Sequence, residues 1–113
     1  MPHTYVRPKA KISKIKDELI GGNKQDIFAV VGDDGRYRGF IRASDLLNDK
    51  FSADSTAEEV LDDRDNFEHR DVYIYPDTSI AQARKVIDAN RISFVPIVDY
   101  NGYYVGTLDR SAT

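Results

Sequence analysis

The sequence contains no cysteine among its 113 residues. Without cysteine, a disulfide framework, a thiolate metal site and a thiol nucleophile are all excluded. No stretch approaches the roughly 18 consecutive apolar residues of a membrane-spanning helix, and the first residues lack the apolar segment of a signal peptide. We therefore expect a soluble, cytoplasmic protein without membrane insertion, whose stability comes from packing, including packing between chains.

Residues suited to catalysis are scarce. There is no Gly-x-x-x-x-Gly-Lys phosphate loop and no Gly-x-Ser-x-Gly nucleophile elbow. His3 and His69 are the only histidines. His69 lies close to Glu68 and Asp71, but this spacing fits no standard set of metal ligands, so we interpret it as part of a solvated loop. The sequence predicts neither a catalytic nor a metal site, and we do not expect an enzyme.

The net charge of −3 combines two segments of opposite sign. Residues 1–25 carry six Lys or Arg against two acids, whereas residues 48–71 carry nine acids against three Lys or Arg. We interpret both segments as solvated faces. A nucleic-acid surface would need a denser basic stripe, so we expect no nucleic-acid partner.

Two short apolar runs flank the dipeptide Asn101-Gly102 within residues 94–109. Both residues of this dipeptide tolerate the positive φ of a type I′ turn, so the stretch predicts a β-hairpin. The same design occurs earlier, where Asp33-Asp34-Gly35 separates an apolar strand over residues 26–31 from a returning strand over residues 37–42.

A short extended segment and a helix precede each hairpin. The first extended segment is Tyr5-Val6, and its helix ends at Gly21-Gly22, where glycine takes the left-handed position. The second is residues 72–75, and its helix has Asp77 or Thr78 as the N-cap and Asn90 as the C-cap. The apolar helix faces are Ile12, Ile15 and Leu19 in the first half, and Ile80, Ala83 and Ile87 in the second.

The region between the two hairpin units is irregular and acidic. Residues 43–48 are expected to form a short helix capped by Ser44 or Asp45. Within residues 49–71, Thr56-Ala-Glu-Glu59 has the spacing of a capping box and predicts a short helix through Leu61. We interpret residues 49–71 as a connector.

The two halves correspond position by position. Ile12 lies 68 residues before Ile80, and Gly35 and Gly39 lie 67 residues before Gly102 and Gly106. Recurrence of helix face and glycines in register indicates an internal duplication whose two units share a core. We expect an α/β (α+β) fold of two β-α-β-β-α repeats, over residues 1–48 and 72–113.

On these residues the chain resembles a tandem pair of CBS domains (the cystathionine-β-synthase type), together called a Bateman module. The resemblance covers about residues 5–113. It implies two repeats packed with pseudo-twofold symmetry, a homodimer, and clefts that bind AMP, ADP, ATP or S-adenosylmethionine. Because the family's second repeat normally continues into a closing helix, we expect an excised fragment or a shortened second repeat. The motifs that carry the resemblance are Val95-Pro96-Ile97-Val98-Asp99, Pro76-Asp-Thr-Ser-Ile80 and Gly39-Phe-Ile-Arg-Ala-Ser-Asp45.

The family's ligand motif reads glycine, an apolar residue, any residue, Thr or Ser, two further residues and Asp. Its hydroxyl contacts phosphate, and its aspartate accepts hydrogen bonds from ribose hydroxyls. In the first repeat Gly39, Phe40 and Asp45 match, and Arg42 replaces the hydroxyl residue, where it would bind phosphate bidentately. The second repeat has Asp109 and Ala112 at the two polar positions, so the resemblance implies a site that binds no nucleotide there.

Each candidate residue also has a structural interpretation. Asp45 is explained equally well as an N-cap, and Arg42 as a surface or ion-pairing arginine. Pro96, a candidate cleft residue, would otherwise shape a strand edge or bulge. Phe28, which we assign with Phe40 to the apolar wall of the site, is also expected in the core.

We therefore expect a non-catalytic regulatory module that dimerises, senses an adenosine nucleotide and controls an attached enzyme, transporter or channel. No cofactor is expected to be required. The site is expected beside Asp33-Asp34-Gly35, with Asp45 as its polar residue. The alternative is a ligand-free dimerisation or interaction module, which the dense tyrosines of the second half favour: Tyr73, Tyr75, Tyr100, Tyr103 and Tyr104.

Overall fold

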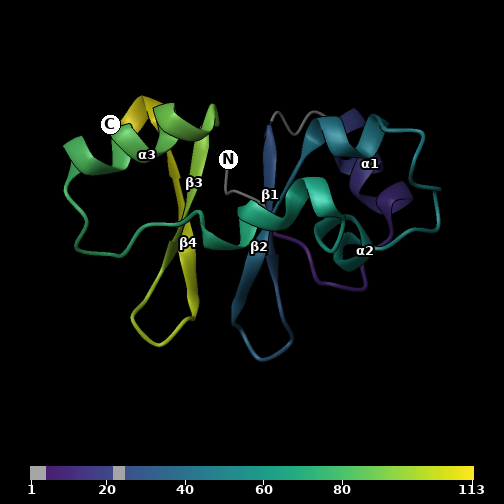
Figure 1. The fold of residues 1–113 in the computed structure, drawn as a ribbon, viewed down its shortest axis with the longest axis horizontal. Helices are drawn as coiled ribbons and strands as arrows, with labels where there is room; N and C mark the ends of the chain where they lie inside the picture. Colours follow the sequence, from purple (N-terminus) through teal and green to yellow (C-terminus); the bar gives the residue numbers. More distant parts are fainter. Residues whose placement is uncertain (1–4, 22–24) are drawn as a thin grey trace.

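The computed structural model describes residues 5–21 and 25–113. Figure 1 shows two β-hairpins side by side with their tips pointing the same way, flanked by α3 on one side and by α1 and α2 on the other. Within the described ranges, no helix has the length and apolar character needed to cross a membrane. The elements are α1 (Ile12–Ile20), β1 (Ile27–Val31), β2 (Tyr37–Arg42), the 3-10 helix η1 (Ala43–Leu47), α2 (Ala57–Leu61), the 3-10 helix η2 (Arg64–Asp71), α3 (Ile80–Asn90), β3 (Phe94–Val98), β4 (Tyr104–Asp109) and the 3-10 helix η3 (Arg110–Ala112).

Each antiparallel hairpin, β1 with β2 and β3 with β4, is joined by a parallel segment that forms a single bridge. The N–H of Val6 donates to the oxygen of Ala29, and the oxygen of Val6 accepts from the N–H of Val31, both at 2.9 Å. Ile74 bridges β3 in the same way, with bonds of 2.9 and 2.8 Å. The first strand expected in each repeat is thus a single bridging residue.

The two repeats are related by pseudo-twofold symmetry, which is visible in reciprocal hydrogen bonds between the hairpins. The N–H of Tyr37 donates to the oxygen of Gly102, and the N–H of Tyr104 donates to the oxygen of Gly35, both at 3.0 Å. Each bond becomes the other when the two repeats are exchanged. The internal duplication and the α/β (α+β) fold of two repeats are therefore confirmed.

The hairpin turns differ from the expected type I′ geometry. The N–H of Gly102 donates to the oxygen of Asp99 at 3.0 Å, and the N–H of Asp99 donates to the oxygen of Tyr103 at 2.9 Å. Gly102 has a φ of 89°, whereas Asn101 does not have a positive φ. This is a three-residue loop that ends in a left-handed glycine, and the loop at Asp33-Asp34-Gly35 repeats it.

The start of α3 lies later than the sequence predicts. Ser79 is the N-cap, and its Oγ accepts a hydrogen bond from the N–H of Gln82 at 3.1 Å. The expected caps Asp77 and Thr78 are therefore wrong. Thr78 instead accepts from the N–H of Tyr75 at 3.0 Å and closes the turn before the helix.

The predicted helix ends also differ. Arg91, not Asn90, takes the left-handed position after α3, with a φ of 54°. Gly21 follows α1 with a φ of −72°, so it is not left-handed. Gly22 lies outside the described residues.

The connector contains more helix than expected. Thr56 caps α2, since its Oγ1 accepts from the N–H of Glu59 at 3.2 Å, which confirms the predicted helix start. The 3-10 helix η2 over Arg64–Asp71 was not predicted, because its sequence is almost entirely polar.

The first sheet contributes to both parts of the hydrophobic core. One of its faces packs under α1 and α2, and the other reaches the core of the second repeat through Ile27 and Phe40. Ile80 is 52% exposed, so only two residues of the expected α3 face are buried. The first cluster includes Ile12, Ile15, Phe28, Val30, Ile41 and Val60, and the second includes Ile74, Ala83, Ile87 and Val95.

Candidate functional site

The candidate site begins where β2 runs into η1. Arg42 ends the strand and is the N-cap of η1, and its backbone N–H donates to Oδ2 of Asp45 at 2.8 Å. The expected caps Ser44 and Asp45 are wrong in position, because Asp45 lies inside the first turn and closes it from there. This hydrogen bond holds Arg42 and Asp45, which occupy the two polar positions of the motif, next to each other.

The guanidinium group of Arg42 reaches across to the second repeat. It donates to the oxygen of Asn90 at 2.8 Å and to that of Arg91 at 3.4 Å. These carbonyl groups lie at the C-terminal end of α3, which carries partial negative charge. Arg42 therefore links the two repeats, a role that the sequence pattern did not indicate.

The ring of Phe40 is covered by His69. Phe40 is fully buried, and the two rings stack with centroids 4.2 Å apart and an angle of 11° between their planes. Nδ1 of His69 lies 3.2 Å from the oxygen of Phe40, and because a carbonyl oxygen can only accept, Nδ1 is the protonated nitrogen in this contact. The prediction of a solvated loop at His69 is therefore wrong.

Burial lowers the pKa of the His69 imidazole below its ordinary value, and the positive charge of Arg42 lowers it further. Asp45 acts in the opposite direction but more weakly. His69 is therefore neutral at pH 7 and belongs to the same electrostatic group as Arg42 and Asp45. No sequence signal marked it, since it comes from the polar connector.

The candidate residues Gly39 and Phe28 make packing contacts within the first repeat. Gly39 has a φ of 142°, and a Cβ atom there would lie 2.8 Å from a methyl group of Leu61. Phe28 pairs with Ile41, while its neighbour Ala29 pairs with Phe40, so Phe28 lies on the opposite face of the sheet from Phe40. Phe28 is fully buried in the core of the first repeat.

Pro96 is buried in β3 opposite Thr107, in the sheet of the second repeat. The oxygen of Pro96 accepts the bridging hydrogen bond from Ile74. The β3–β4 register shifts immediately after it, between Ile97 and Val98.

The turn at Asp33-Asp34-Gly35 does not join this group. It lies at the tip of the first hairpin, whereas Asp45 follows the other end of β2 (Figure 1). The expectation that the site lies beside this turn is wrong, because the six residues of β2 separate them.

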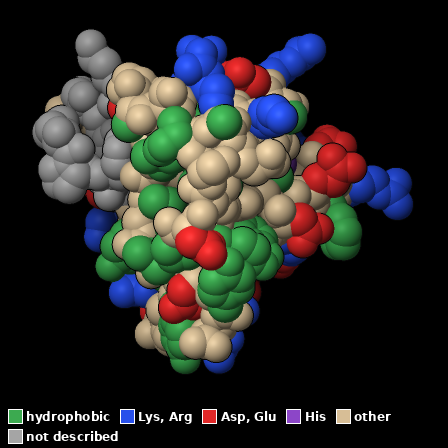
Figure 2. All heavy atoms as spheres, turned by 90° about the vertical axis from the view of Figure 1, so that its left-hand side faces the viewer, with side chains coloured by type: hydrophobic (Ala, Val, Ile, Leu, Met, Phe, Trp, Pro, Cys, Tyr) green, Lys and Arg blue, Asp and Glu red, His purple; other side chains and the backbone are tan. Residues whose placement is uncertain are grey.

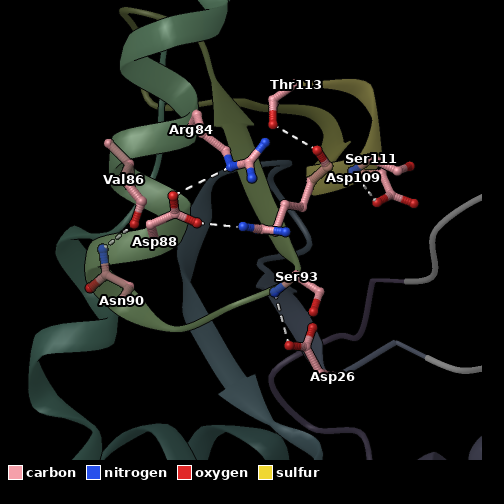
Figure 3. Close-up of polar contacts among 10 residues, drawn as sticks. Asp26, Arg84, Val86, Asp88, Asn90, Ser93, Asp109, Ser111 and Thr113 are labelled. Carbon is pink, nitrogen blue, oxygen red and sulfur yellow. Dashed lines mark hydrogen bonds and ion pairs between the residues drawn. The ribbon is translucent and has the colours of Figure 1, made fainter.

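The matching positions of the second repeat make internal contacts of another kind. Oδ1 of Asp109 accepts from the N–H of Ser111 at 2.9 Å, as Figure 3 shows. Beside it, Arg84 and Arg110 both contact Asp88, and the hydrogen bond from Arg110 lowers the pKa of the Asp88 carboxyl group. Within the described ranges, no group of three or more potential ligands is arranged to hold a metal ion.

Three cavities of about 410, 370 and 280 Å³ lie elsewhere on the first repeat, and neither Asp45 nor Arg42 lines any of the three. His69, the third member of the group, also lines none of these three cavities.

Comparison with known proteins agrees with this architecture. Residues 65–112 match the model of the CBS domain family. No curated protein sequence matches the chain significantly. Among solved structures, the chain is similar to the CBS domains of a transcriptional regulator from Streptococcus pneumoniae, with a TM-score of 0.78, 20% identity, and coverage of 98% of this chain and 88% of that one.

Two further similar structures contain nucleotides. One is the cytosolic domain of the Mg²⁺ channel MgtE in complex with ATP, with a TM-score of 0.77, 18% identity, and coverage of 96% of this chain and 42% of that one. The other is CBSX2 in complex with AMP, with a TM-score of 0.77, 17% identity, and coverage of 98% and 86%.

Proposed function

We propose, from the premise that the chain is a tandem CBS domain pair, that it is a non-catalytic regulatory module that senses an adenosine nucleotide. The similar structures that contain ATP and AMP support this ligand class, and the channel domain among them supports an attached transporter, channel or enzyme as the regulated partner. We place the module in the cytoplasm and expect it to act as a homodimer.

The observation that carries the proposal is the position of Arg42 between Asp45 and α3. Its guanidinium group donates to the neutral carbonyl oxygen of Asn90 at 2.8 Å. A phosphate would compete for the same N–H groups, because a hydrogen bond between two charged groups is roughly twice as strong as one between neutral groups. Ligand binding would then release the contact between the repeats.

Because phosphate and the carbonyl group of Asn90 compete for Arg42, ligand binding would change how the two repeats pack against each other. Asp45 keeps one oxygen available for ribose hydroxyls, since its Oδ2 is the atom that accepts from the backbone of Arg42. An adenine ring would replace His69 on Phe40, because both are flat and stack in the same way. A ligand that favours the released arrangement shifts the population toward it, which is how the signal reaches the partner.

Titration calorimetry with AMP, ADP, ATP and S-adenosylmethionine tests the proposal. We expect at least one nucleotide to bind, and Asp45→Asn to weaken binding about tenfold, the effect of losing roughly 1.4 kcal/mol. Arg64→Met is a control for the loss of a surface charge, because Arg64 is exposed and lies outside the family motif. Absence of binding for all four ligands at millimolar concentration contradicts nucleotide sensing.

An uncovered part of β4 favours a second candidate, a ligand-free interaction module. Nothing lies within 4 Å of a Cβ atom placed on Gly106, and Val105 is 58% exposed. Figure 2 shows hydrophobic side chains gathered on the outward face of the second repeat. If the uncovered part of β4 is the dimer interface, Val105→Asp lowers the mass measured by light scattering, whereas Asp45→Ala does not.

A further inference from the structure

Residues 53–61 cover an apolar surface of the first repeat, and the matching surface of the second repeat is uncovered. Ile12 and Ile41 are buried in one cluster with the apolar residues of α2. Ile12 is 1% exposed, whereas its counterpart Ile80 is 52% exposed. Ile41 is fully buried, whereas its counterpart Leu108 is only partly buried. In Figure 1, α1 and α2 lie beside the first hairpin, but of the described α-helices only α3 lies beside the second.

The corresponding glycines of the two surfaces show the same difference. A Cβ atom on Gly39 would lie 2.8 Å from a methyl group of Leu61, because this side chain of α2 occupies the space above the glycine. A Cβ atom on Gly106 would meet nothing within 4 Å. Val105, next to Gly106, is 58% exposed. The second repeat thus has an open position beside an exposed apolar side chain, where the first repeat has a leucine side chain.

The backbone groups beside the two surfaces also differ. The N–H of Ile12 donates to the oxygen of Ser55 at 2.9 Å, whereas the N–H of its counterpart Ile80 donates to no described residue. The backbone oxygen of Ala10 accepts from the first N–H of α2 at 2.8 Å, whereas that of its counterpart Thr78 accepts from no described residue. In the first repeat, these bonds hold an extended stretch and the start of α2 in place.

We propose that the uncovered surface binds a segment of another protein that has the form of residues 53–61, an extended stretch followed by a short amphipathic helix. The extended stretch would bond to the backbone of Ile80 and Thr78, and an apolar side chain at the position of Leu61 would fill the space above Gly106. The surface, which we call the β4 surface, consists of Ile80, Ile97, Val105, Gly106 and Leu108.

The two kinds of contact in the first repeat favour this occupant. Hydrogen bonds from the backbone give affinity to an added extended segment, and apolar side chains at fixed spacing give specificity. A second copy of the chain fits less well, because its own residues 53–61 are already bound to its first repeat.

A synthetic peptide with the sequence of residues 51–63 is the probe, and its binding to the full chain is measured by NMR titration. A free peptide of this length is not stably helical in water, so we expect a weak Kd of about 1 mM. Amide shifts should change at Ile80, Val105 and Gly106. The peptide with Leu61→Asp should leave these shifts unchanged. No shift changes at millimolar peptide, or equal changes with both peptides, would overturn the inference.

Two variants of the β4 surface should weaken peptide binding without disturbing the fold. Gly106→Val fills the open position, and Ile80→Asp places a charge on the surface, so each should weaken binding about tenfold. An acidic residue at the start of α3 also suits the helix dipole. Leu47→Asp is the matched control, because Leu47 is 76% exposed and lies outside the β4 surface. Equal weakening in all three variants would contradict binding at this surface.

Two measurements separate this inference from nucleotide sensing and from dimerisation. Asp45→Asn should leave peptide binding unchanged, because Asp45 contacts Arg42 and does not belong to the β4 surface. A loss of peptide binding in this variant would overturn the assignment. Without peptide, Ile80→Asp should leave the mass measured by light scattering unchanged. A lower mass would show that the β4 surface joins two copies of the chain, which would also overturn the inference.

Discussion

Oδ2 of Asp26 accepts a hydrogen bond from the backbone N–H of Ser93 at 2.9 Å, and these residues occupy the same position in the two repeats, 67 residues apart (Figure 3). Arg36 and Tyr103, which also correspond, form an antiparallel bridge at the hairpin ends. The repeats thus touch through corresponding residues at both ends of their interface. Any change in their relative packing must alter one of these contacts or the neighbouring one from Arg42.

The corresponding glycines Gly39 and Gly106 should respond differently to substitution by alanine. Gly39 has a φ of 142°, and a Cβ atom would lie 2.8 Å from Leu61 and 3.2 Å from the Cα of Arg70. We expect Gly39→Ala to lower the free energy of unfolding by about 2–4 kcal/mol in urea denaturation, because strain and overpacking add.

Gly106→Ala is the matched control, because its Cβ would meet nothing within 4 Å. We expect a change within about 0.5 kcal/mol. Equal losses in the two variants would mean that α2 does not pack on Gly39 in solution.

The second hairpin turn can be tested at its two central residues. Gly102 has a φ of 89°, so Gly102→Ala should destabilise the protein by about 1–2 kcal/mol. Asn101 does not need a positive φ here, and Asn101→Ala should change the stability by less than about 0.5 kcal/mol. Thermal unfolding measures both variants. A type I′ turn has a positive φ at both residues, so a comparable loss of stability in the two variants would indicate that turn type instead.

Arg42 should contribute to stability through its contact with the second repeat. Arg42→Met removes the hydrogen bonds to the oxygens of Asn90 and Arg91 and should lower the free energy of unfolding by about 1 kcal/mol, since the side chain is only partly buried. Arg64→Met, without such a contact, should stay within about 0.5 kcal/mol of the wild type. A similar loss in both variants would show that the contact contributes nothing.

Periodicity and the duplicated glycines were enough to predict the repeats and the strands β2 and β3. These sequence patterns are local, and each occurs in both halves of the chain, so the prediction for one half supports the prediction for the other. The N-cap of α3 was harder to predict, because Asp77, Thr78 and Ser79 can all cap a helix and only the folded turn decides among them.

The site was less predictable than the fold. The motif selected Asp45 and Arg42, and the structure brings these two residues together, while their role in binding stays a prediction. The stacking of His69 on Phe40 and the reach of Arg42 to Asn90 both depend on how distant segments pack, and one sequence carries no signal for such contacts.

His69 should make the stability depend on pH in the weakly acidic range. Burial and the charge of Arg42 lower its pKa in the folded state below the ordinary value of 6.5. As the pH falls through about 6.5, the unfolded chain therefore binds a proton that the folded chain does not, and the folded state loses stability. The loss continues until the pH reaches the lowered pKa of the folded state.

Urea unfolding at about pH 7.5 and about pH 5.5 measures this effect in the wild type and in His69→Gln. We expect the wild type to lose more stability between these values, since glutamine keeps a polar side chain but does not titrate. His3 is present in both proteins, so it cancels in the difference. Equal losses would mean that burial and the charge of Arg42 do not lower the pKa of the His69 imidazole in the folded state.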